Sequence, residues 1–229
     1  GIPHVRICYI PGPHAPQIKK MTGQTETPVL RVDGRAIHGS ASIIDFVEQR
    51  FPTPALYPAE AAARNDALAV QAKLDAELGT QVRLAVFDAV IDDARFVAAT
   101  FASEKAAWKR KAYEAAFPVI RNVMKKSMDI TPENGRRARE RVEALLDWLA
   151  EKSSATGYLV GDSFSVADLT AAALLGPVAL VEHPDMRQAE PRPARFSALC
   201  AGWADHPGMR WAQGIWRKHR PARVGIVIA

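Results

Sequence analysis

The residues best suited to binding a ligand lie between Thr27 and Ser40. Pro28 opens a short apolar run, and Asp33-Gly34 interrupts it as in a tight β-hairpin, because glycine adopts a positive φ at little cost. Ser40 follows where a helix is expected to begin, so its hydroxyl would stand beside the free N–H groups of the first helical turn. Such a corner suits a ligand that carries carboxylates and a peptide bond.

Two short strands and a helix must position this corner. The strands, 29–32 and 35–37, flank the turn, and the proline before them marks a strand entry or an edge because it cannot donate to a sheet ladder. We expect Ser40 to cap the helix, whose apolar residues fall at helical spacing: Ile43, Phe46 and Val47.

The residues before the corner predict one more strand and one more helix. The strand is Val5–Ile10, which ends at a Pro-Gly-Pro turn, and the helix is Ala15–Met21. Cys8 lies on this strand, where we expect it to pack rather than to react. Together these elements form an α/β unit over residues 1–51.

From Ala59 onward the pattern contains helices only. Apolar residues recur at every fourth position from Val70 to Val86, which predicts a long helix over 59–93. Further helices are expected over 103–127 with a kink at Pro118, from Thr131, and over 165–180, 195–204 and 207–220. The proline-rich residues 52–58 are the expected linker between the α/β unit and an all-helical unit over 59–220. Residues 221–229 form an apolar tail with no assigned partner.

Ser165 and Asp168 have the spacing of a helix capping box, in which each side chain bonds the backbone of the other residue. Such a box contributes on the order of 1–2 kcal/mol. We therefore interpret Asp168 as a folding residue rather than an acid catalyst.

The composition excludes several classes of protein. Two cysteines, Cys8 and Cys200, do not make a disulfide framework and favour a reducing cytoplasm. No apolar run reaches the roughly 18 residues of a membrane helix, and no metal-ligand cluster stands out. The net charge is +5, but the basic residues alternate with acidic ones and no basic-plus-aromatic motif accompanies them, so neither nucleic acid nor membrane is an expected partner. A positive surface would still attract an anionic substrate.

Four segments resemble the cytosolic glutathione transferase family, in its bacterial form. They are the Thr27–Ser40 corner, Phe51–Pro58, Tyr158–Asp168 and His206–Trp211, and they stand in the family's order. The resemblance implies an α/β plus all-α architecture, with a thioredoxin-like domain that binds glutathione and a helical C-terminal domain. It also implies glutathione as co-substrate, a small electrophile as second substrate, and a homodimer.

The resemblance places glutathione at the corner. A cis bond is expected before Pro28, with backbone groups of Thr27 and Val29 on the cysteinyl part of glutathione. Ser40 and the amide of Ala41 would hold the γ-glutamyl carboxylate.

Gly39 departs from the family pattern. The family usually has an acidic residue or glutamine there, which pairs with the amino group of glutathione, and losing such a bond costs about 1.5–3 kcal/mol. His38 is nearby, but a histidine at a strand end is more often a surface residue than a replacement.

The reactive group of the family is a Ser, Cys or Tyr at the end of its first strand. Gly1–Val5 resembles the point where the family's first helix ends and its second strand begins. We therefore expect the catalytic residue, the first strand and the first helix upstream of Gly1. The 229 residues alone are then expected to bind glutathione poorly, to have no transferase activity, and to leave strand 5–10 without a neighbour.

Three functions stay open at this point. The first is an enzyme that joins glutathione to small electrophiles or uses it in isomerisation, dehalogenation or thiol exchange. Candidates for its second-substrate face are Arg83, Phe87 and Arg95, although core packing is the simpler role for Phe87. The second is a non-catalytic interaction or structural domain of the same fold, which Gly39 favours. The third is a reductase-like protein with an upstream Cys-x-x-Cys pair. The residues that precede Gly1 would separate the three.

Overall fold

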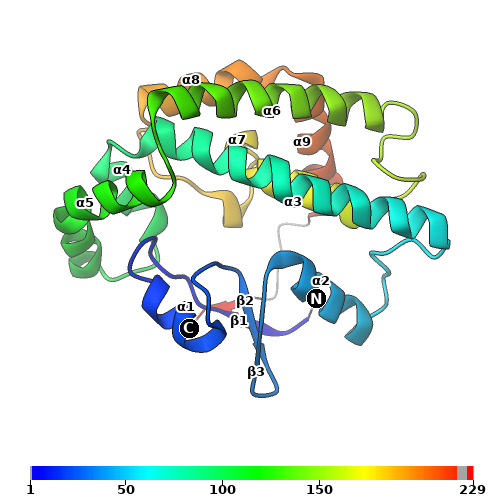
Figure 1. Ribbon diagram of the computed structural model, residues 1–229, viewed down its shortest axis with the longest axis horizontal. Helices are drawn as coiled ribbons and strands as arrows, with labels where there is room; N and C mark the ends of the chain where they lie inside the picture. Colours follow the sequence, from blue (N-terminus) through cyan, green and yellow to red (C-terminus); the bar gives the residue numbers. More distant parts are fainter. Residues whose placement is uncertain (1, 221–225, 229) are drawn as a thin grey trace.

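A computed structural model describes residues 2–220 and 226–228 and places a small α/β unit beneath a layer of helices (Figure 1). Of the expected tail, 221–229, only residues 226–228 are described. The expected catalytic residue upstream of Gly1 also lies outside the described residues. The α/β plus all-α architecture predicted from the sequence is confirmed.

The α/β unit contains β1 (His4–Arg6), α1 (Ala15–Thr22), β2 (Val29–Val32), β3 (Arg35–His38) and α2 (Ser40–Arg50). Strands β2 and β3 pair antiparallel, as predicted. Asp33 and Gly34 both have positive φ, 49° and 75°, which is the backbone of a type I′ hairpin turn. Among the described residues, no third strand joins this hairpin.

Strand β1 is shorter than the predicted Val5–Ile10 and pairs in parallel with β4 (Ile226–Ile228), with His4 opposite Ile226. The prediction that this strand has no neighbour is therefore wrong for the chain as described. The segment of the tail that pairs with it consists of β-branched residues, which favour extended backbone. A pairing between the two ends of a chain leaves no local signal in the sequence.

The helical layer begins with α3 (Ala61–Val90), α4 (Ala94–Phe101) and α5 (Ala107–Ser127). The predicted helix over 103–127 is wrong in its start, and α4 was not predicted at all. Asp93 caps α4, since its carboxylate accepts the N–H of Phe96 at 2.8 Å. Pro118 lies inside α5.

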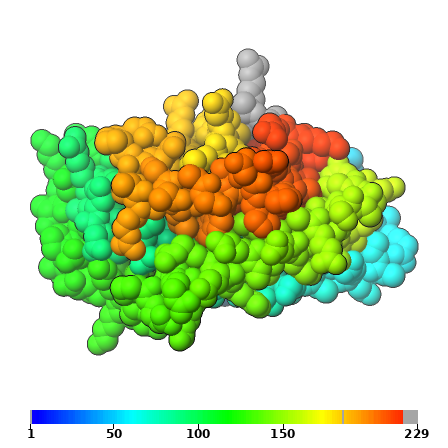
Figure 2. All heavy atoms as spheres, turned by 90° about the horizontal axis from the view of Figure 1, so that it is seen from above, coloured from blue at the N-terminus to red at the C-terminus, as the bar shows by residue number. Residues whose placement is uncertain are grey.

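The remaining helices agree with the predicted ranges to within a residue or two. They are α6 (Pro132–Ser153), α7 (Val166–Ala179), α8 (Ala194–Ala204) and α9 (Pro207–His219). A 3₁₀ turn, η1 (Pro184–Met186), was not predicted. Figure 2 shows α8 and α9 side by side with α6 on the upper face of the layer. Helix α3 packs against α6 and α7, and the core between them is apolar and closed to solvent.

Helix α9 approaches α6 very closely at Gly208. A Cβ atom built on Gly208 would overlap the carbonyl oxygen of Leu146 on α6. Met209 and Leu146 are both fully buried beside this contact. The missing side chain is what lets the two helices meet.

Asp168 is fully buried at the start of α7 and forms a capping box with Ser165. One carboxylate oxygen accepts the backbone N–H of Ser165 at 2.9 Å and its hydroxyl at 3.0 Å. The other oxygen accepts the N–H of Leu159 at 2.8 Å, from the loop before the helix. The carboxylate therefore holds that loop as well as the helix end.

Two sets of hydrogen bonds join the α/β unit to the helices. Near the end of α2, Glu48 accepts the N–H groups of Leu56 and Tyr57 at 2.8 and 2.9 Å, and the carbonyl of Leu56 accepts the N–H of Val166 at 3.1 Å. On α5, the Tyr113 hydroxyl donates to the carbonyl of Pro11 at 3.0 Å.

The burial of Tyr113 predicts that its hydroxyl loses its proton only at high pH. Burial raises the pKa of Tyr113 to about 12, above the ordinary value of about 10 in an unfolded chain. Because the folded state holds the proton more tightly, this tyrosine contributes stability below pH ~10 that is lost as the pH rises through about 12. An absorbance titration of tyrosinate should show a late step that Tyr113→Phe removes. If the variant instead loses an early step, the assignment is wrong.

Candidate functional site

Strand β2 and helix α2 meet at an exposed corner of the α/β unit (Figure 1). The N–H of Gly39 donates to the carbonyl of Pro28 at 3.2 Å, which holds the start of the helix against the start of the strand. The Thr27–Pro28 peptide bond is cis, and Thr27, Pro28 and Ser40 are all open to solvent. The candidate residues at both ends of the hairpin thus come together.

Ser40 does not cap α2, so that prediction is wrong. The cap is Gly39, whose φ of 83° turns the chain into the helix and whose carbonyl accepts the N–H of Ile43 at 3.1 Å. Ser40 is the first helical residue, and its side chain makes no hydrogen bond with any described residue. Its hydroxyl and the first-turn N–H groups of Ser40 and Ala41 are therefore available to an anion.

The backbone of Gly39 gives a physical reason for the missing acidic side chain. A positive φ strains any residue with a Cβ atom, although nothing lies within 4 Å of the place where that atom would be. The corner thus has donors for a carboxylate and no acidic side chain at position 39 for an amine. His38, at the end of β3, is exposed.

Nearly the whole chain, including the corner with its cis proline, hairpin and helix start, matches the models of a known family. The model of the glutathione S-transferase N-terminal domain matches residues 1–55, and that of the glutathione S-transferase C-terminal domain matches residues 59–206. The chain belongs to the glutathione S-transferase family.

Two solved structures of similar fold illustrate the likeness. A glutathione S-transferase from Rhodospirillum rubrum F11 is 19% identical, with a TM-score of 0.57, covering 90% of this chain and 72% of the other. The beta-etherase LigF from Sphingobium sp. strain SYK-6 is 18% identical, with a TM-score of 0.55, covering 87% and 82%. At these identities the likeness shows the fold alone. No curated protein sequence matches the chain.

The surroundings of Cys8 disfavour a reactive thiolate at this position. Cys8 follows β1, partly shielded from solvent. Burial and the neighbouring Glu104 carboxylate raise the pKa of the Cys8 thiol. A raised pKa keeps the thiol protonated, and the thiolate is the nucleophilic form.

The residues proposed for the second-substrate face differ in burial. Phe87 is buried and stacks on Phe101, with ring centroids 5.7 Å apart, so it packs in the core. Arg83 on α3 and Arg95 on α4 are exposed. None of the three lines the cavity that the structure shows at the end of α7.

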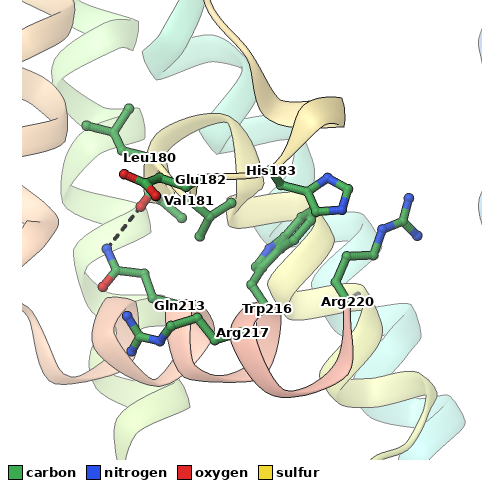
Figure 3. Close-up of a pocket in the computed structure, with 9 residues that line it drawn as sticks. Leu180, Val181, Glu182, His183, Gln213, Trp216, Arg217 and Arg220 are labelled. Carbon is green, nitrogen blue, oxygen red and sulfur yellow. Dashed lines mark hydrogen bonds between the residues drawn. The ribbon is translucent and has the colours of Figure 1, made fainter. Parts of the chain in front are cut away.

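That cavity was not anticipated from the sequence. It lies between residues 180–183, which follow α7, and the C-terminal half of α9 (Figure 3). Leu180 adopts φ 50°, a left-handed conformation that leucine rarely takes, and nothing in the local sequence signals it. Over the described residues, no metal-ligating cluster is found and no helix is long and apolar enough to cross a membrane.

Proposed function

We propose that this glutathione S-transferase family chain binds glutathione at the corner formed by Thr27, Pro28, Val29, Gly39, Ser40 and Ala41, here called the glutathione corner. The observation that supports this most is the uncommitted hydroxyl of Ser40 beside free N–H groups at the start of α2. The γ-glutamyl carboxylate would accept hydrogen bonds from Ser40 and Ala41, and the backbone of Thr27 and Val29 would pair with the cysteinyl unit.

The proposed reaction is transfer of glutathione to a small electrophile. The glutathione thiolate forms a bond from its sulfur to the electrophilic carbon, and the leaving group departs with the electron pair of the broken bond. The group that stabilises the thiolate would be a Ser, Cys or Tyr, as the family resemblance implies. The proposal also includes a detoxifying role, a reducing cytoplasm and a homodimer.

Glutathione binding tests the proposal in the chain as it stands. An NMR titration with reduced glutathione should shift the amides of Ser40 and Ala41, with weak affinity because Gly39 offers no partner for the amine. Ser40→Ala should weaken binding about tenfold, since it removes a hydrogen bond to a carboxylate. Ser42→Ala is the matched control, because Ser42 lies two residues further along α2 and is also exposed. This variant should bind glutathione as the parent does. Equal affinity of Ser40→Ala and the parent would refute the glutathione corner.

A second candidate is a non-catalytic domain of the same fold that serves in protein interaction or structure. Gly39 favours it, because the backbone there disfavours the side chain that would hold the amine of glutathione. The same titration separates the two: absence of any shift at the glutathione corner supports the non-catalytic function.

A further inference from the structure

The cavity beside α9, here called the α9 pocket, has one wall made by a single helix face. Gln213, Trp216, Arg217 and Arg220 fall at positions i, i+3, i+4 and i+7, so they lie in one stripe along the last turns of α9. Residues 180–183 form the facing wall (Figure 3). The volume is about 400 Å³, within the range of a small-molecule site.

Both walls are fixed by hydrogen bonds and ring contacts. Gln213 donates through its side-chain amide to the carbonyl of Ala179 at 3.0 Å, which ties α9 to the end of α7. The indole N–H of Trp216 donates to the carbonyl of Ala172 at 2.7 Å. The buried ring of His183 lies 5.5 Å from the Trp216 ring, so residues 180–183 are held over the helix. The pocket therefore exists before any ligand arrives.

The lining combines an apolar surface with positive charge. Leu180, Val181 and the Trp216 ring are apolar, and the only polar atom of the indole is already bonded. Arg217 makes no ion pair with a described residue. A second hollow on the other side of residues 180–183 adds Arg187 and Arg192. Among the described residues that line the two hollows, four are arginines and one, Glu182, is acidic; of the arginines, Arg192 is already paired with Glu190 at 2.9 Å.

We infer that the α9 pocket binds an aromatic carboxylate, with its ring against Trp216 and Leu180 and its carboxylate paired with Arg217. Arg217 is exposed, and its guanidinium can hold a carboxylate by two parallel hydrogen bonds. A neutral ligand of the same shape would gain the apolar contact only. None of the lining residues belongs to the glutathione corner, so this inference stands independently of glutathione binding.

The test is a calorimetric titration of the full chain, without glutathione, using 2-naphthoate and its neutral analogue 2-naphthamide. The naphthoate should bind, and the amide should bind about tenfold more weakly or not at all, as expected for the loss of one charge-assisted pair. Arg217→Gln should weaken naphthoate binding about tenfold and leave the amide unchanged, whereas Arg217→Lys should keep part of the affinity because it keeps the charge.

Arg210→Gln is the matched control. Arg210 is on the same helix, exposed and paired with Asp205 at 2.8 Å, and it does not line the pocket. This variant should bind naphthoate as the parent does, and circular dichroism should show all variants folded. Three results would overturn the inference: no binding of naphthoate, equal binding of naphthoate and naphthamide, or equal losses in Arg217→Gln and Arg210→Gln.

Discussion

Asp168→Ala is expected to lower the free energy of unfolding by about 3–5 kcal/mol, because it leaves three donors without their acceptor and each costs roughly 1–3 kcal/mol when buried. The N–H and hydroxyl of Ser165 are buried with the carboxylate, and so is Leu159. Water does not reach these groups to compensate. The loss exceeds that of an ordinary helix cap because the same carboxylate also anchors the preceding loop.

Urea denaturation followed by circular dichroism measures this effect. Asp162→Ala is the control: Asp162 is an exposed carboxylate in the same loop, and its loss should change stability by no more than about 0.5 kcal/mol. Ser165→Ala should fall between the two, at about 1 kcal/mol, as a simple cap loss does. A destabilisation of Asp168→Ala as small as that of Asp162→Ala would contradict the structural role.

Gly208→Ala is the second large effect, with an expected loss of about 3 kcal/mol or more, because overpacking against backbone forces helices apart. The obstacle is the carbonyl oxygen of Leu146, which cannot rotate away as a side chain can. Relief requires α9 to move from α6, and the fully buried Met209 beside the contact would lose packing.

Gly214→Ala provides the comparison on the same helix. Nothing lies within 4 Å of the place where its Cβ atom would be, so the variant should gain up to about 1 kcal/mol from helix propensity. Thermal unfolding of the two variants should thus shift in opposite directions. Equal shifts would show that the close approach of α9 to α6 is not real.

Helix ranges were predictable where periodicity, a cap and a stop agree. Thr131 followed by Pro132 marks the start of α6, and the side chain of Thr131 accepts the N–H of Asn134 at 3.1 Å. Helix α4 was missed although Asp93 caps it, because eight residues give too few turns for an apolar period to stand out. The pairing of β1 with β4 was beyond local reasoning, since the partner strands stand at opposite ends of the chain.

At the glutathione corner, the sequence located the elements but not the role of each residue. Serine before an apolar helix usually caps it, and this preference assigned Ser40 the wrong position. The backbone of Gly39 forms the turn into the helix instead. The position of the cap depends on the φ angle of Gly39, and the residue type alone does not determine that angle. The α9 pocket could not be predicted from the sequence for a related reason: its wall depends on the left-handed backbone of Leu180.

The bonds of Glu48 have a consequence for affinity at a distance. Helix α2 starts at the glutathione corner and buries none of its own residues fully, so the bonds that Glu48 makes with Leu56 and Tyr57 help to fix its direction. Leu56 in turn bonds the first residue of α7. On the proposed function, ligand affinity at the corner and the folding of the helical layer would therefore be linked. Substitutions in residues 52–58 would then change ligand binding without contacting the ligand.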